Sequence, residues 1–178
     1  MVNIQNRLMT FELETKKVEK GTIILRAGEV SNYCFKVLKG CLKSFVFDNT
    51  GREHILQFAP ENWWISDLDS FLNNKPSGVF IVALEDSEVV YFDKADYANL
   101  KNLPNSELLE EINLLTNNII SQNKRLILLL SSTGEERYLT FIQTYPNLTQ
   151  RLPLKLIASY VGVTPEHLSY LRKKIAQK

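Results

Sequence analysis

Closely spaced turn signals divide residues 20–92 into short runs rich in β-branched and aromatic residues, and this pattern constrains the fold more than any other. Many short strands separated by regular turns are typical of a β-sandwich or barrel. The loop 49–51 ends in Gly51 and predicts a hairpin, whereas residues 63–72 break the pattern and predict a short helix at the barrel edge. The predicted strands cover residues 22–25, 33–38, 41–47, 54–58, 79–84 and 89–92.

A run without Gly or Pro from residue 106 to residue 131 predicts a helix roughly 39 Å long, at 1.5 Å per residue. Its apolar residues recur in steps of three, four and seven, the spacing of a heptad seam. The pattern favours a two-stranded coiled-coil dimer helix, in which the polar Gln122 helps to fix the register. The alternative is a helix that lies on the barrel. The apolar seam residues are Leu108, Ile112, Leu115, Ile119, Leu126 and Leu129.

Residues 134–178 are predicted to form a small helical unit, with Gly134 as a hinge after the long helix. Helices are expected over 135–144 and 153–160, and a third from Thr164 onward.

Residues 152–174 have the pattern of a helix-turn-helix. Ala158 is small where the two helices approach, and Gly162 suits the turn because a positive φ costs glycine little. Thr164 is a good N-cap, and Pro165 follows at the first helical position. The apolar residues that would pack the two helices together are Ile157, Val161, Val163, Leu168 and Leu171.

The last helix has a polar and basic outer face, which is what reading the major groove of DNA requires. Arg172 and Lys174 flank this face and can reach phosphates. The alternative is an ordinary helical hairpin with a solvated face. Residues 134–178 carry 7 Lys/Arg against 3 Asp/Glu, whereas the whole chain has a net charge of +1, so the basic excess lies at this end. The candidate DNA-binding residues are Thr164, Pro165, Glu166, Ser169, Tyr170, Arg172, Lys173 and Lys174.

Composition argues against several other classes of protein. Two cysteines, Cys34 and Cys41, are too few for a disulfide scaffold or a cysteine-ligated cluster, and we assign them no role. Two histidines, His54 and His167, do not make a metal centre, and His54 is expected at the hairpin surface. With no signal peptide, membrane span or catalytic constellation in the sequence, we expect a cytoplasmic protein that is not an enzyme and has no metal or cofactor.

The chain resembles the cAMP-receptor-protein/FNR (Crp/Fnr) family of bacterial transcription regulators. The resemblance implies an α+β fold: a cyclic-nucleotide-binding-type β-roll (a double-stranded β-helix), a long dimerisation helix and a C-terminal helix-turn-helix, in a short form lacking the terminal wing. It implies a sensor domain over 1–103, the dimerisation helix and hinge over 104–133, and a DNA-binding domain over 134–178. Gly28 and Gly40 match the turn glycines of the β-roll. The matching segments are residues 20–45, 51–72, 83–92, 136–146 and 152–174.

The same resemblance indicates an effector pocket, and two departures from the family pattern bear on its ligand. Ser66, Asp67 and Leu68 match the turn that meets the ribose of cAMP, and Asp67 can accept from a hydroxyl. The phosphate-binding motif falls at Ser77 without its arginine, which removes the strongest charge-assisted contact with an anion and argues against a cyclic nucleotide. Trp64 completes the candidate pocket for a small-molecule effector of unknown identity.

These expectations combine into one function with one alternative. The chain is predicted to regulate transcription as a homodimer that binds a near-palindromic site in double-stranded DNA, with RNA polymerase as a possible further partner. Glu166 matches the family glutamate that accepts from cytosine, but Tyr170 stands where many members have a guanine-reading arginine. The alternative is a sensor module whose helical C-terminus binds a protein.

Overall fold

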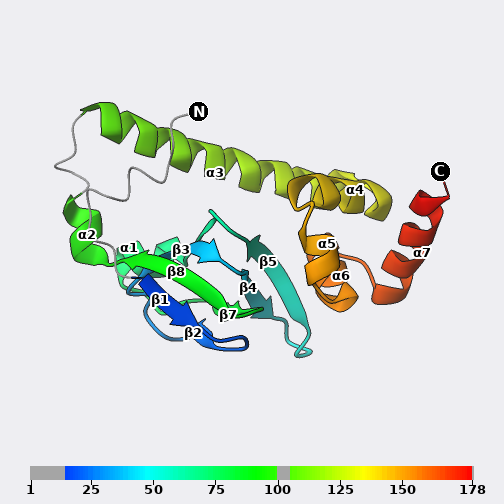
Figure 1. Ribbon diagram of the computed structural model, residues 1–178, viewed down its shortest axis with the longest axis horizontal. Helices are drawn as coiled ribbons and strands as arrows, with labels where there is room; N and C mark the ends of the chain where they lie inside the picture. Colours follow the sequence, from blue (N-terminus) through cyan, green and yellow to red (C-terminus); the bar gives the residue numbers. More distant parts are fainter. Residues whose placement is uncertain (1–14, 100–104, 178) are drawn as a thin grey trace. The chain divides into compact units, whose positions relative to one another are not determined.

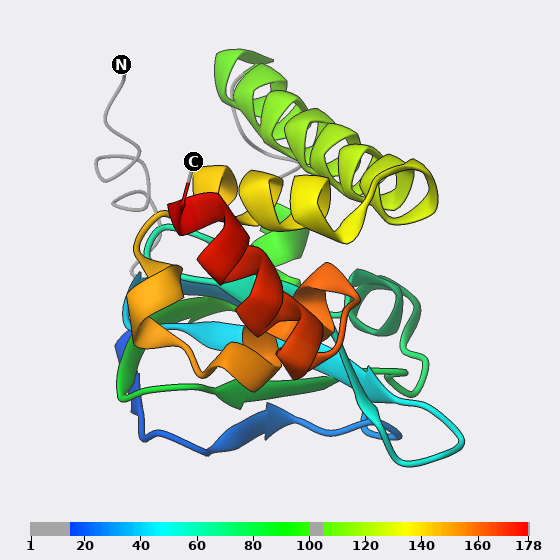
Figure 2. The same ribbon diagram turned by 90° about the vertical axis from the view of Figure 1, so that its right-hand side faces the viewer.

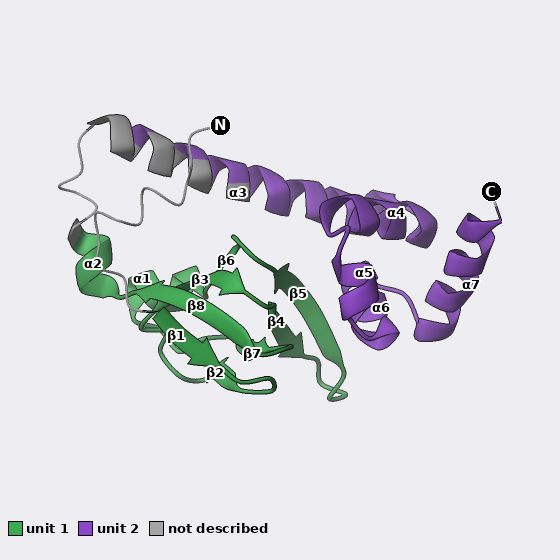
Figure 3. Ribbon diagram, in the orientation of Figure 1, with its two compact units in different colours: residues 1–102 green, residues 103–178 purple. Residues whose placement is uncertain are grey.

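The computed structural model describes residues 15–99 and 105–177. The chain divides into two compact units, residues 1–102 and residues 103–178 (Figure 3).

The first unit is built from two four-stranded antiparallel sheets, shown in Figure 1, and the predicted β-roll is confirmed. One sheet has the order β1 (Thr15–Val18), β8 (Ser87–Phe92), β3 (Cys34–Lys39) and β6 (Trp64–Ile65). The other has the order β2 (Ile23–Leu25), β7 (Phe80–Ala83), β4 (Leu42–Phe47) and β5 (Glu53–Ala59). Two short helices, α1 (Leu68–Asn73) and α2 (Lys94–Asn99), complete the elements of this unit.

The core of the roll takes side chains from both sheets. Leu42 on β4 is paired with Ala59 on β5 and with Ala83 on β7, so these three side chains share one face of the second sheet. The buried cluster consists of Val18, Leu25, Phe35, Val37, Leu42, Ala59, Ile65, Ile81, Ala83 and Val89.

The predicted hairpin joins β4 to β5, and Asp48 organises its turn. One carboxylate oxygen of Asp48 accepts hydrogen bonds from the backbone N–H groups of Thr50 at 2.9 Å and Arg52 at 3.0 Å. The other oxygen lies 2.7 Å from Nε2 of His54. The Thr50 hydroxyl also donates to the first oxygen, at 2.6 Å, and this bond contributes most to holding the pKa of Asp48 well below its usual value, followed by the contact with His54. His54 lies at the surface of the hairpin as expected.

Three sequence predictions for this unit were wrong in detail. The helix expected over 63–72 begins only at Leu68, because Trp64 and Ile65 pair with β3. Cys34 and Cys41 fall in the strands predicted over 33–38 and 41–47, but β3 and β4 belong to different sheets and Cys41 lies between them. Strand β1 was not predicted, since the segment TKKV exposes three of its four residues and lacks an apolar pattern.

The second unit is helical, with the order α3 (Asn105–Ser131), α4 (Gly134–Thr144), α5 (Leu148–Arg151), α6 (Leu154–Val161) and α7 (Pro165–Ala176). Helices α6 and α7 lie against each other, and α7 also contacts α4 (Figure 2). The short α5 was not predicted. The buried residues here are Tyr138, Phe141, Tyr145, Leu148, Leu152, Ile157, Ala158, Val161, Leu168 and Leu171.

Gly134, the predicted hinge, has a packing role. It is the first residue of α4, which starts at a capping box made by Thr133 and Glu136. A Cβ at Gly134 would lie 2.9 Å from Cγ1 of Val163 and 3.4 Å from Nε2 of His167. The glycine therefore allows the start of α4 to approach the turn before α7 closely.

Candidate functional site

The turn between α6 and α7 has the geometry of a helix-turn-helix. Gly162 ends α6 with φ 74°, and its N–H donates to the carbonyl of Ala158 at 2.9 Å. Two residues later Thr164 caps α7, its Oγ1 accepting from the N–H of His167 at 3.2 Å, with Pro165 at the first helical position. These local signals were all readable in the sequence.

Buried apolar side chains hold the two helices together. Ile157 and Val161 on α6, and Leu168 and Leu171 on α7, are each at most 3% exposed. Val163 is half-buried in the turn. The packing face of α7 is thereby fixed, and its opposite face is left to solvent.

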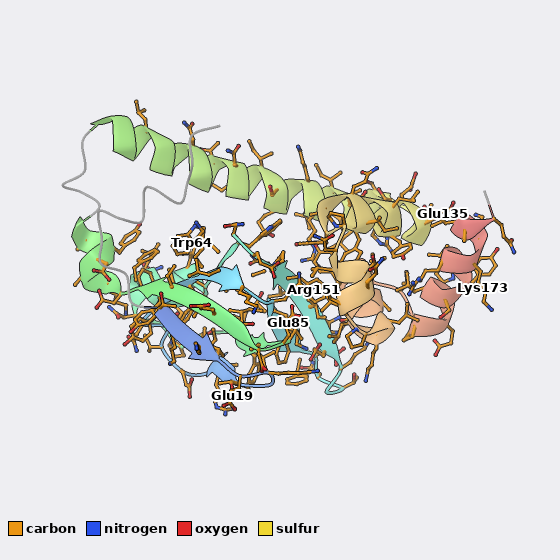
Figure 4. All side chains as sticks on the ribbon, in the orientation of Figure 1. Glu19, Trp64, Glu85, Glu135, Arg151 and Lys173 are labelled. Carbon is orange, nitrogen blue, oxygen red and sulfur yellow. The ribbon has the colours of Figure 1, made fainter. Side chains whose placement is uncertain are left out.

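The predicted DNA-binding residues follow this division. Pro165 and Ser169 are half-buried. Lys173 projects from α7 as Figure 4 shows, and Tyr170 is 60% exposed. The exposed members of the set are Thr164, Glu166, Tyr170, Arg172, Lys173 and Lys174.

Two charged residues of this set already have partners within the unit. Lys174 forms an ion pair with Glu135 on α4, which raises the pKa of Lys174. The carboxylate of Glu166 accepts from its own backbone N–H and from the Thr164 hydroxyl, which lowers the pKa of Glu166. Glu166 is therefore an ionised acceptor close to the start of α7, and the Glu135 pair offsets part of the positive charge of Lys174.

Sequence reasoning missed His167 on the same helix. Its side chain is exposed, and its ring centroid lies 6.1 Å from that of Tyr170, with the rings tilted by 30°. The spacing of three residues from Tyr170 was the available signal, because such residues are neighbours on a helix surface.

The long helix α3 presents an apolar surface. The structure describes the side chains of Ile119, Gln122, Leu126 and Leu129 from the predicted seam, and all four are exposed. The side chains of Leu108, Ile112 and Leu115 lie outside the described residues. The apolar surface is wider than the narrow seam that was predicted, since it also includes Leu109, Ile120, Ile127 and Leu130, of which Leu130 is 79% exposed.

The candidate effector pocket brings Asp67 and Ser77 together. One carboxylate oxygen of Asp67 caps α1 by accepting from the N–H of Ser70 at 3.1 Å. The other accepts from Oγ of Ser77 at 2.8 Å and from the N–H of Gly78 at 3.3 Å. Ser77 is only 4% exposed. Both oxygens of the predicted ribose acceptor therefore have partners within the unit.

The other predicted pocket residues make contacts of their own. Ser66 donates from Oγ to the carbonyl of Tyr33 at 3.2 Å, and Leu68 is 41% exposed. Trp64, labelled in Figure 4, packs edge-on against Phe92 with ring centroids 5.2 Å apart. A cavity of about 150 Å³ in this unit has none of the predicted pocket residues in its lining, which consists of residues 24, 25, 29–33 and 35.

The part of the chain that the structure describes offers no metal site and no membrane span. No group of three or more His, Cys, Asp or Glu residues in it could hold a metal ion. None of its helices is both long enough and apolar enough to cross a membrane.

Comparison with known proteins agrees with this architecture. Residues 15–102 match the model of the cyclic nucleotide-binding domain. The chain is 30% identical to the anaerobic regulatory protein of Pasteurella multocida, an alignment that covers 89% of this chain and 62% of that protein. It is also 30% identical to the regulatory protein HlyX of Actinobacillus pleuropneumoniae, over 89% of this chain and 70% of HlyX. The chain thus spans roughly two thirds of the length of these relatives.

The fold is shared with solved structures of low sequence identity. FixK2 from Bradyrhizobium japonicum superposes with a TM-score of 0.77 at 16% identity, covering 93% of this chain and 85% of FixK2. The β-roll, the helix-turn-helix and the two regulatory relatives lead to one assignment. The chain belongs to the Crp/Fnr family of transcription regulators.

Proposed function

We propose that the chain binds DNA sequence-specifically as a homodimer and regulates transcription. The observation that carries this proposal is the exposed polar and basic face of α7, on a helix whose opposite face is buried against α6. A recognition helix enters the major groove with its N-terminal residues at the base edges, and Glu166, Ser169 and Tyr170 occupy that part of α7.

The exposed apolar surface of α3 supports the homodimer. A helix of 27 residues with leucines and isoleucines more than 40% exposed gains stability when a second copy covers them. Two recognition helices related by a two-fold axis then meet successive major grooves about 34 Å apart. The expected site is a near-palindrome.

We further propose that the β-roll is a sensor whose effector is not a cyclic nucleotide. Ser77 stands at the position of the phosphate motif and carries no charge. Its side chain is buried, and its hydroxyl donates to Asp67. An anionic phosphate would find no guanidinium there, and three hydrogen bonds from Ser70, Ser77 and Gly78 already occupy most of the acceptor capacity of Asp67.

Selection from a random duplex library with the purified, ligand-free protein tests this function. We expect enrichment of a near-palindrome, with no change when cAMP is added. The DNA-binding proposal is wrong if no duplex is enriched and the C-terminal helices instead bind a protein with an affinity that does not change with salt concentration. The protein-binding alternative then holds.

A pair of lysine variants checks that α7 makes the contacts. Lys173→Ala, on the exposed face of α7, is expected to weaken binding uniformly across sequences and to reduce the log–log salt slope by about 1. Lys124→Ala, an exposed lysine on α3 outside the helix-turn-helix, is the matched control and should leave the slope unchanged. Equal effects of the two variants would contradict the assignment of α7 as the recognition helix.

A further inference from the structure

Arg125 joins the long helix to the helix-turn-helix. Its guanidinium carbon lies 3.9 Å from the centre of the Tyr160 ring, a short cation–π distance. Its Nη2 also donates to the carbonyl oxygen of Tyr160 at 3.3 Å. One side chain of α3 therefore holds both the ring and the backbone of the last turn of α6.

Aromatic packing in turn holds Tyr160 in place. The centre of its ring is 5.6 Å from that of Phe141 and 5.7 Å from that of Tyr145, both of which are almost fully buried. Aromatic pairs at these distances stabilise one another through defined relative orientations. Because Tyr160 cannot shift without disturbing this cluster, its contact with Arg125 fixes α6 against α3.

Arg137 on α4 makes a second connection between the same helices. Its Nη1 donates at 2.7 Å to the carbonyl of Ser132, directly after α3, and its Nε donates at 2.7 Å to that of Val161. Its Nη2 donates to the carbonyl of Gly162 at 3.3 Å. Carbonyl groups at helix C-termini carry partial negative charge, and the planar guanidinium can bind several of them at once. Arg137 thus bridges the C-terminal ends of α3 and α6.

We propose that Arg125 and Arg137 are positioning residues that set the placement of the recognition helix relative to the dimer helix, and with it the spacing of the DNA half-sites that the dimer accepts. The proposal rests on the proposed function, since it needs a dimer held through α3. Helix α7 follows α6 through a short, capped turn, so whatever fixes α6 to α3 also places α7.

Half-site spacing gives a readout that a purely structural role would not change. The probes are the selected palindrome, the same palindrome with one or two base pairs added at its centre, and a duplex with a single half-site. We expect the native protein to prefer the correct spacing strongly, and Arg125→Ala to reduce that preference on the order of tenfold. Affinity for the single half-site should stay within about twofold, because α7 itself is intact.

Two further variants complete the set. Arg125→Lys retains a cation over Tyr160 and should recover part of the spacing preference. Lys124→Ala removes the neighbouring exposed lysine and is the matched control, with the native preference expected. If Arg125→Ala keeps the native preference, or loses half-site and full-site affinity equally, the positioning role is overturned.

Spin labels give a test that does not depend on DNA. Cysteines introduced by Asn123→Cys on α3 and Lys173→Cys on α7 carry the labels, while the native Cys34 and Cys41 are buried. The labelled chain is diluted with unlabelled chain so that distances within one copy dominate. We expect one narrow distance distribution that broadens in Arg125→Ala. An unchanged distribution overturns the positioning proposal even if the protein binds no DNA, whereas absent DNA binding with the expected broadening overturns only the proposed function.

Discussion

Two buried lysines in the β-roll have very different surroundings. Lys43, 6% exposed, is paired with Glu53 at 2.6 Å and lies 4.4 Å from the centre of the Phe45 ring. Lys36 is 2% exposed, and no hydrogen bond or ion pair joins it to any residue that the structure describes. Its Nζ lies 6.0 Å from the centre of the Trp64 ring, and burial lowers its pKa below the usual 10.5.

Lys36→Met is therefore expected to raise the free energy of unfolding by at most about 1 kcal/mol near neutral pH, because the apolar side chain has no charge to desolvate. Between the lowered pKa of folded Lys36 and 10.5, the unfolded chain binds more protons than the folded chain, so the native protein gains stability as pH rises. The advantage of the variant should then shrink as the pH approaches 10.5. Urea unfolding of the native protein and of the Lys36→Met variant at several pH values measures this difference in stability.

The paired lysine supplies the control for this prediction. Lys43→Met leaves Glu53 without its cation and is expected to destabilise the protein. If Lys36→Met destabilises the protein as much as Lys43→Met does, Lys36 has a stabilising anionic partner and the prediction is wrong.

The junction between α3 and α4 shows how an element boundary depends on residues far away in the chain. Gly134→Ala improves intrinsic helix propensity by up to about 1 kcal/mol, but the new Cβ would lie 2.9 Å from Cγ1 of Val163. We expect the clash to dominate and to destabilise the protein by about 1–3 kcal/mol in thermal unfolding. Val163→Ala in the same chain should restore much of the loss, as a double-mutant cycle would show. A stabilising Gly134→Ala would mean that propensity alone governs this position.

Features that depend on local contacts could be predicted from the sequence, whereas features that depend on contacts between distant residues could not. Gly162, Thr164 and Pro165 act through backbone groups within four residues, so the helix-turn-helix was readable from local signals. The contact of Gly134 with Val163 and the pairing of β1 with β8 join residues tens of positions apart, and no local pattern encodes them. The resemblance matched the pocket motif to Asp67 and Ser77, but only the structure shows that these two side chains are hydrogen-bonded to each other.

At the scale of the whole molecule, the proposed dimer depends on the apolar surface of α3. Leu126 is 54% exposed and occupies a predicted seam position, where its counterpart in a second copy would face it across the two-fold axis. Leu126→Glu would place two like charges in that seam, so we expect a monomer in sedimentation equilibrium. Asn117→Glu, at an exposed polar position on the opposite face of the same helix, adds the same charge away from the apolar surface and should remain a dimer.

The monomer should still bind one half-site, because the substitution on α3 leaves α7 and its packing against α6 unchanged. Its affinity for the full palindrome is expected to fall to that for a single half-site, since the second recognition helix no longer binds as part of the same molecule. A Leu126→Glu protein that stays dimeric would place the dimer interface elsewhere on the chain. A monomer with full palindrome affinity would show instead that two separate chains assemble on the DNA without help from α3.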